Sequence, residues 1–233
     1  IPVEVAVMQK MSETPVDSVI RLIQWFDEPK RYILILERPY PCKGLDTLID
    51  IYGGSLSEEM ARIFMLQVVQ AVFECQKRGV IHRDIKLENI LINMETTEIK
   101  LIDFGCGDLI KRFGYNYFEG KMESWFCSKL QNSNTTLKNM ILRIPYFSFS
   151  FIFSGTFQYC PPEFFITGRY CATPATVWSL GVLLYEMVCG SVPFKDESEI
   201  IGGPLRFKDD LSDGKINESI LMNQRKTHTD YQL

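Results

Sequence analysis

The chain has 233 residues, of which 46% are hydrophobic and 23% charged, and its net charge at pH 7 is −4. This composition is typical of a folded globular protein and gives no electrostatic reason to expect a nucleic acid or an anionic membrane surface as a partner. Seven dispersed cysteines without Cys-x-x-Cys spacing, and only two histidines, argue against a zinc site and favour a reducing compartment, the cytoplasm or also the nucleus.

The sequence contains no apolar run of the roughly 18 residues that a membrane helix requires. Its start, IPVEVAVMQK, has neither the basic region nor the cleavage site of a signal peptide. We therefore expect no membrane partner, and we expect the sequence to begin inside a domain.

Residues 3–11 carry apolar side chains at a spacing that predicts a short helix. Two strands are predicted next, over VIRLIQWF (19–26) and RYILILE (31–37). The four residues DEPK (27–30) between them are typical of a turn, because Pro29 stands at a position that turns favour.

The clearest helix is predicted over residues 57–78. Ser57 is a good N-cap, Glu58 suits the positively polarised helix start, and Gly79 can end the helix. The apolar side chains at helical spacing are expected on one buried face: Met60, Ile63, Phe64, Val68, Ala71, Val72 and Cys75.

A hairpin is predicted from NILI (89–92) and IKLI (99–102), joined by residues 93–98. Residues 175–190, ATVWSLGVLLYEMVCG, are apolar on nearly every side, as a helix can be only where it is buried in a large core. From Gly202 onward the sequence is polar and has no readable period.

The strongest chemical signal is HRDIKLEN (82–89) followed by DFG (103–105). Seven specified positions fall in order at a restricted spacing: His82, Arg83, Asp84, Lys86, Asn89, Asp103 and Gly105. The pattern resembles the catalytic loop and the metal-binding loop of protein kinases. Two other interpretations stay open. In the first, these polar residues only connect a turn to a hairpin and have no chemical role. In the second, the chain has a kinase fold without kinase activity.

The resemblance implies a role for each of these side chains, because phosphoryl transfer depends on positioning and charge neutralisation. Asp84 is expected to receive or orient the proton of the substrate hydroxyl, and Lys86 to balance charge on the transferred phosphoryl group. Asn89 and Asp103 are expected to hold Mg²⁺ between the phosphates of ATP, since a hard cation prefers oxygen ligands.

Further segments extend the resemblance. PPE (161–163) stands where kinases carry Ala-Pro-Glu, and VWSLGVLLYEM (177–187) resembles their central buried helix. Lys86, two residues after Asp84, is similar to the serine/threonine branch of the family.

LILERPYP (34–41) resembles the unusual hinge of the PIM serine/threonine kinases. Pro39 has no N–H, so one hydrogen bond that most kinases donate to adenine is unavailable, while the Glu37 carbonyl can still accept from the adenine amine. IRLIQWF, LIDFGCGDLI and VWSLGVLLYEMVCGSVPF are similar to PIM sequences too, and Thr176 agrees with the absence of the usual aspartate at its position.

The same alignment implies the remaining site residues. Glu4 matches the glutamate that pairs with the ATP-orienting lysine, Leu36 the gatekeeper, and Leu91 and Ile102 the floor of the adenine pocket. Substrate contacts are expected from Glu88 and Thr156.

PIM kinases favour basic peptides through acidic residues, of which Glu88 is kept. The corresponding Gly44 and Leu87 are not acidic. A preference for basic Ser/Thr peptides is therefore a hypothesis. Its test is whether phosphorylation of a peptide falls when the basic residues are removed.

The resemblance covers residues 1–119 and 156–209 and implies an α+β, protein-kinase-like fold. Residues 1–37 are expected to be a remnant of the small lobe, with one helix and two strands, and residues 38–119 and 156–209 the mainly helical large lobe. No Gly-rich loop and no Val-Ala-Ile-Lys strand occurs in the sequence, so Glu4 lacks its lysine.

Residues 120–155 interrupt the expected activation segment, and 210–233 are expected to be an unrelated tail. Deleting 35 residues (155 − 120) restores FEGTFQYCPPE. The codons for Gly120-Lys121 can contain a splice-donor sequence, and those for Ser154-Gly155 a splice acceptor. The segment YFSFSFIFS (146–154) is what a polypyrimidine tract encodes. The insert therefore has the features of a retained intron. A natural loop insertion, or a regulatory or lipid-contacting hairpin, remains an alternative.

The first function hypothesis is a monomeric serine/threonine kinase that uses ATP and Mg²⁺ on protein substrates. A non-catalytic kinase-like binding module is the second. The third is an unstable product of a mis-spliced transcript or a faulty gene model, and the absent loop and lysine favour either of these two over activity.

Overall fold

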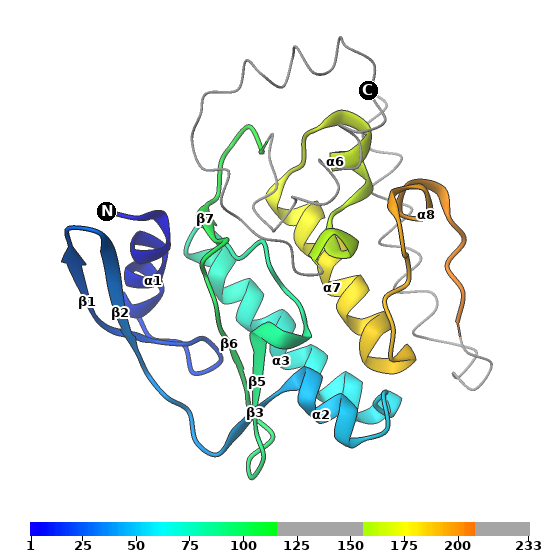
Figure 1. The fold of residues 1–233 in the computed structure, drawn as a ribbon, viewed down its shortest axis with the longest axis horizontal. Coiled ribbons are helices and arrows are strands. Elements are labelled where there is room, and N and C mark those ends of the chain that lie inside the picture. Colours follow the sequence, from blue (N-terminus) through cyan, green and yellow to red (C-terminus); the bar gives the residue numbers. More distant parts are fainter. Residues whose placement is uncertain (116–155, 208–233) are drawn as a thin grey trace.

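The computed structural model describes residues 1–115 and 156–207. The expected insertion at 120–155 and the expected tail at 210–233 lie outside the described residues. Helices and strands are mixed, and the expectation of an α+β fold is confirmed (Figure 1).

The N-terminal part consists of one helix and a two-stranded antiparallel ribbon. These are α1 (Val3–Glu13), two residues longer than predicted, β1 (Leu22–Glu28) and β2 (Arg31–Leu36). The turn is confirmed but shorter, because Asp27 and Glu28 belong to β1. This part lies at one side of the molecule, beside the strands of the larger part (Figure 1).

The prediction of a strand from residue 19 is wrong at its start. Val19 forms a parallel bridge with Leu101, Leu101 N–H donates to Ser18 O at 2.8 Å, and Ile20 N–H donates to Leu101 O at 2.9 Å. Ser18 O and Ile20 N–H thus pair with a strand of another sheet, and the ribbon with β2 begins only at Leu22.

The larger part combines two small sheets with helices. One sheet has the order β3-β5-β6 and the other pairs β4 with β7. The strands are β3 (Cys42–Gly44), β4 (Val80–Ile81), β5 (Ile90–Asn93), β6 (Ile99–Leu101) and β7 (Asp108–Leu109). The helices are α2 (Leu45–Ile51), α3 (Glu58–Lys77), α6 (Pro162–Thr167), α7 (Ala172–Cys189) and α8 (Glu197–Gly202), with short 3₁₀ turns η1 (Leu87–Asn89) and η2 (Thr156–Tyr159). The predicted hairpin is confirmed as β5 and β6.

Helix α3 begins and ends as predicted. The Ser57 hydroxyl accepts from Met60 N–H at 3.3 Å, and Gly79 follows the helix with a φ of 69°. One residue of the predicted apolar face is wrong: Ile63 is 46% exposed, whereas Ala61 is fully buried. The face that packs inward is centred on Phe64, Val68 and Cys75, and Ile63 lies roughly 100° around the helix from Phe64.

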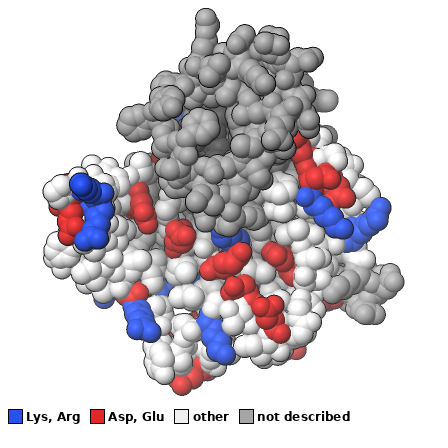
Figure 2. All heavy atoms as spheres, in the orientation of Figure 1, with Lys and Arg blue, Asp and Glu red and all other residues white. Residues whose placement is uncertain are grey.

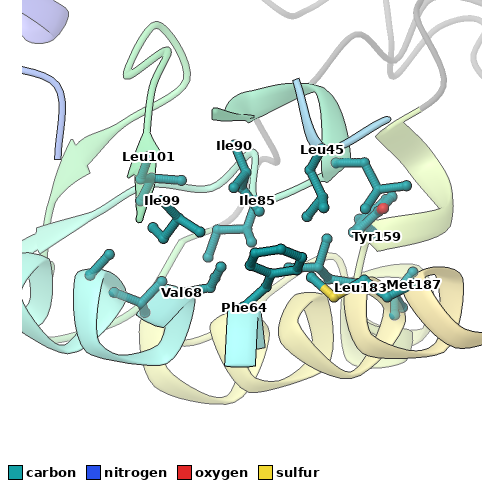
Figure 3. Close-up of a cluster of buried hydrophobic side chains, with 14 of the residues drawn as sticks. Leu45, Phe64, Val68, Ile85, Ile90, Ile99, Leu101, Tyr159, Leu183 and Met187 are labelled. Atoms are coloured by element: carbon teal, nitrogen blue, oxygen red, sulfur yellow. The ribbon is translucent and has the colours of Figure 1, made fainter. Parts of the chain in front are cut away.

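Helix α7 is the central buried helix that the sequence predicts. Its 18 residues have a mean hydropathy of 1.2 and are apolar enough, by length and composition, to cross a membrane, so the expectation that no run reaches that length is corrected. Packing explains the apolarity, because 61% of these residues are buried inside the fold. Figure 3 shows Leu183 and Met187 of α7 with Phe64 and Val68 of α3 beneath the residues of the β5–β6 hairpin.

The end of α7 touches the loop between α2 and α3 at Gly190. Its φ is 71°, and a Cβ on Gly190 would overlap the carbonyl oxygen of Gly54. Leu56 N–H donates to Met187 O at 2.8 Å across the same junction. Only glycine satisfies both the conformation and the close approach.

We predict that Gly190→Ala lowers the free energy of unfolding by at least about 2 kcal/mol, because it adds left-handed strain and a backbone overlap. Gly181→Ala is the matched control: it lies within α7 with no atom within 4 Å of its Cβ position. We expect that control to be neutral or stabilising. Urea unfolding measures both, and a Gly190→Ala variant as stable as the wild type would contradict the packing described here.

Candidate active site

The predicted catalytic loop lies between β4 and β5 and brings three of the expected side chains together. Lys86 Nζ is 2.9 Å from Asp84 Oδ2, and Asn89 Nδ2 donates to the same oxygen at 2.9 Å and to Asp84 O at 2.8 Å. The other carboxylate oxygen, Asp84 Oδ1, is buried and accepts no hydrogen bond from a described residue. The loop therefore has one carboxylate oxygen that is held and one whose hydrogen-bonding capacity the described residues leave unused.

His82 joins this loop to the segment after β6. Its Nδ1 accepts from Asp84 N–H at 3.3 Å, so Nε2 carries the proton and donates to Ile102 O at 2.9 Å. Burial lowers the pKa of His82, which keeps the ring neutral. The ring also meets Phe104 edge-on, with centroids 4.6 Å apart.

Asp103 comes directly after Ile102 in the chain and is exposed to solvent. Its φ is 60°, and its Oδ1 accepts from Gly105 N–H at 3.1 Å. Ile102 N–H donates to Asn89 O at 2.9 Å, which fixes the backbone before Asp103 against the catalytic loop. A non-glycine residue in this conformation costs about 1–3 kcal/mol and persists only where its surroundings hold it.

Asn89 and Asp103 fit a magnesium ion that is shared with a nucleotide. The Asn89 amide nitrogen is used on Asp84, which leaves the amide oxygen free of that contact and able to serve as a metal ligand together with the Asp103 carboxylate. In the part of the chain that the structure describes, no group of three or more His, Cys, Asp or Glu could hold a metal alone. Mg²⁺ typically takes one or two protein ligands and completes its shell with phosphates and water.

Glu4 of α1 reaches the same place from the N-terminal part. A Cβ on Gly105 would lie 4.0 Å from Glu4 Oε1 and 3.0 Å from Asp103 Oδ1, so both carboxylates border this glycine. Burial and the charge of Asp103 raise the pKa of Glu4. Within residues 1–115 and 156–207, Glu4 forms no ion pair, so the carboxylate lacks a basic partner there.

Arg83 fixes the segment that follows Asp103. Its guanidinium donates to Cys106 O at 2.6 Å and Gly107 O at 3.3 Å, lies 3.7 Å from Asp108 Oδ2, and stacks over the Tyr115 ring. Residues 106–108, which follow Asp103, are thereby tied to the predicted catalytic loop.

The predicted adenine-pocket residues lie around the β5–β6 hairpin and the link from β2 to β3. Leu91 lies on the face of β5 opposite the buried Ile90 and Ile92, and Ile102 follows β6 and is partly buried. Leu36 ends β2 and is 40% exposed, and Pro39 is partly buried in the link. Their contact with adenine stays a prediction.

A second site, beside the catalytic loop, is an acidic pocket of about 210 Å³. The residues that line it are Asp46, Ile49, Asp50, Gly54, Leu87, Glu88, Glu186 and Gly190. Four are carboxylates and none is basic. Figure 2 shows acidic side chains near the middle of one face of the molecule, in the region of η1 and α2.

Sequence reasoning found Glu88 in this pocket but missed Asp46, Asp50 and Glu186. Asp46 and Asp50 are four residues apart on α2, a spacing that places them on one side of a helix and was the available signal. Glu186 comes from α7 and had no local signal. Burial raises its pKa, the hydroxyl of Tyr159 donates to its carboxylate and lowers the pKa, and the charge of Glu88 raises it.

Thr156 begins η2, which leads into the PPE segment at α6. Its expected contact with a substrate stays a prediction.

Comparisons with known proteins agree with this geometry. The protein kinase domain model matches residues 1–135 and 147–220. The chain is 35% identical over 218 residues to the serine/threonine-protein kinase pim-2 of Danio rerio, covering 91% of this chain and 59% of that protein. It is 36% identical over 212 residues to prk-2 of Caenorhabditis elegans, covering 89% of this chain and 39% of that protein.

The serine/threonine-protein kinase ppk25 of Schizosaccharomyces pombe is 31% identical over 166 residues, which is 69% of this chain and 31% of that protein. The chain thus spans less than two thirds of the length of these relatives. Because the family model covers most of the sequence, the chain belongs to the protein kinase domain family.

Proposed function

We propose that the chain acts as a PIM-like serine/threonine protein kinase, which transfers the γ-phosphate of ATP to Ser/Thr hydroxyls of protein substrates. The observation that carries this proposal is the arrangement around Asp84: Oδ2 is held by Lys86 and Asn89, while Oδ1 is buried and accepts from no described residue. A carboxylate held in this way is suited to a hydroxyl proton. The two relatives with the highest identity given above, both named serine/threonine kinases, support the same class and the PIM-like subtype.

In this mechanism Asp84 Oδ1 accepts a hydrogen bond from the attacking hydroxyl and orients its oxygen toward the phosphorus. Lys86, 2.9 Å from Asp84 Oδ2, lies where it can also balance charge on the transferred group. Asn89 and Asp103 would hold Mg²⁺, which supplies charge neutralisation on the phosphates. Glu37, Leu36, Leu91 and Ile102 would receive the adenine, with Pro39 unable to donate a hydrogen bond.

A non-catalytic nucleotide-binding module is the second candidate. Glu4 supports it, because its carboxylate faces Asp103 and has no basic partner among the described residues. A kinase orients the phosphates with a lysine that such a glutamate holds. Phosphate transfer distinguishes the two candidates, since both bind nucleotide.

We further propose that the substrates are basic peptides and that the acidic pocket receives their Lys or Arg side chains. Asp46, Asp50, Glu88 and Glu186 converge there from three elements of the chain. A cation that enters such a pocket gains from several charges at once and from partial exclusion of water. Gly44 and Leu87 are not acidic, but the acidic residues of this pocket support the preference for basic peptides.

A cytoplasmic location, also extending to the nucleus, and a monomeric state complete the proposal. The free state of the six described cysteines, Cys42, Cys75, Cys106, Cys160, Cys171 and Cys189, supports a reducing compartment.

We predict that Asp84→Asn lowers kcat by about 10²–10⁴-fold, because the amide cannot accept the proton. Stabilisation by Mg-ATP in thermal melting should remain, since the side chain keeps its size. Asp17→Asn, an exposed carboxylate far along the chain from the loop, is the control and should keep full activity. Equal turnover of Asp84→Asn and wild type would contradict the assignment, and wild-type nucleotide binding without phosphate transfer would favour the second candidate.

We predict that Glu186→Gln and Glu88→Gln each reduce the preference for basic over neutral peptides by roughly five- to tenfold, the size expected from about 1 kcal/mol per partly buried charge. Peptide pairs that differ only by Arg-to-norleucine replacement measure this ratio. Glu95→Gln, an exposed residue in the β5–β6 turn, should leave the ratio unchanged. If the wild type already phosphorylates both peptides equally, the proposed preference is wrong while the kinase activity stands.

A further inference from the structure

We infer that Lys100 is a positioning residue for nucleotide binding, because it holds the side chain of Glu37 and thereby fixes the segment whose carbonyl is expected to meet adenine. The inference rests on the proposed function. It assigns a role to a residue of β6 that sequence reasoning gave none.

The Glu37 carboxylate is held from two directions. Lys100 Nζ lies 2.7 Å from Glu37 Oε1, and the same oxygen accepts from Arg21 N–H at 2.8 Å. The Glu37 backbone is held as well, because its N–H donates to Arg21 O at 3.0 Å. Lys100 is therefore the one contact in this set that connects Glu37 to the larger part of the molecule.

Lys100 stands on the face of the hairpin that the adenine would cover. It pairs in register with Leu91 across β5 and β6, opposite the buried face formed by Ile90, Ile99 and Leu101. Its side chain is 20% exposed and that of Glu37 is 25% exposed. A pair shielded to this degree is screened less by water and salt than an open surface pair.

The strand that carries Lys100 is itself fixed on both sides. Leu101 exchanges backbone hydrogen bonds with Ser18 and Ile20. On the other side, Gln67 of α3 accepts from Ile99 N–H at 3.0 Å and donates to Thr97 O at 3.0 Å. Lys100 thus extends from a strand that is fixed on both sides, and its ammonium group constrains the position of the Glu37 carboxylate.

Pro39 makes this positioning more important. Because proline cannot donate, the link between β2 and β3 offers adenine fewer hydrogen bonds, and the Glu37 carbonyl has to supply a larger share. The link itself, residues 37–41, lies between two separate sheets. Without Lys100, Glu37 stays bound to Arg21 but can move relative to Leu91 and Ile102.

The test compares Lys100→Met with Lys100→Arg, and uses Lys43→Met as the matched control. Lys43 is an exposed lysine of β3 in the same sheet, so its replacement removes the same charge. We expect Lys100→Met to weaken ADP binding, measured by calorimetry, by about three- to tenfold, with KM for ATP raised by a similar factor and kcat changed less than about twofold. Lys100→Arg should restore most of the affinity, and Lys43→Met should bind as the wild type does.

Glu37→Gln completes the cycle, because the backbone carbonyl is unchanged and only the charge is lost. If the pair is what positions the hinge, the double variant with Lys100→Met binds ADP no more weakly than either single variant. Fully additive losses would overturn the inference.

A readout without nucleotide separates this inference from the proposed function. Amide hydrogen exchange in residues 36–44 should be faster in Lys100→Met than in the wild type and in Lys43→Met. If the wild type binds no nucleotide but exchange still accelerates, the proposed function fails and the role in nucleotide binding fails with it, while the hold of Lys100 on residues 36–44 stands. If exchange in this segment is unchanged, the inference is wrong whatever the kinase activity.

Discussion

The buried imidazole of His82 joins the two loops on which the candidate active site depends. One ring nitrogen accepts from the Asp84 backbone and the other donates to Ile102 O, so the predicted catalytic loop and the predicted metal-binding loop share one bridge. The two hydrogen bonds together need the neutral ring in one tautomer, because Nδ1 accepts only when it carries no proton, and burial lowers the pKa of His82 in the direction that keeps the ring neutral. Together with the hydrogen bond from Ile102 N–H to Asn89 O and the contacts of Arg83, this bridge places Asp84 relative to Asp103.

The bridge is stable because the elements beneath it are apolar and closely packed. Helices α3 and α7 provide the floor, and the β5–β6 hairpin lies over them with Ile90 and Leu101 fully buried (Figure 3). Burying one such side chain contributes about 1.5–3 kcal/mol. This packing offsets local costs near the site, notably the left-handed backbone of Arg83 and Asp103.

The parts of the fold and of the candidate site that depend on residues close in sequence could be predicted from the sequence. The cap at Ser57, the hairpin and the motif around Asp84 each depend on residues close in sequence, and the structure has all three. The motif also pointed to Lys86 and Asn89, which contact Asp84 in the structure, while their roles in phosphoryl transfer stay predictions.

Most of the features that were not predicted from the sequence depend on contacts between residues that are far apart in the chain. The start of β1 was placed too early because Val19 pairs with Leu101, and Ile63 was assigned to the wrong side of α3 because neighbouring apolar residues define the helix face only approximately. Glu186 and Glu88, on α7 and η1, line one pocket only in the folded chain. The Glu37–Lys100 pair spans 63 residues and has no sequence pattern of its own.

The central claim is that the chain transfers phosphate, and the most direct measurement is mass spectrometry of an Arg-rich serine peptide incubated with the chain, ATP and Mg²⁺. The account predicts that phosphopeptide accumulates in proportion to time and to the concentration of the chain, and that removal of Mg²⁺ abolishes it. The absence of phosphopeptide under conditions where calorimetry shows the chain saturated with nucleotide would contradict the account.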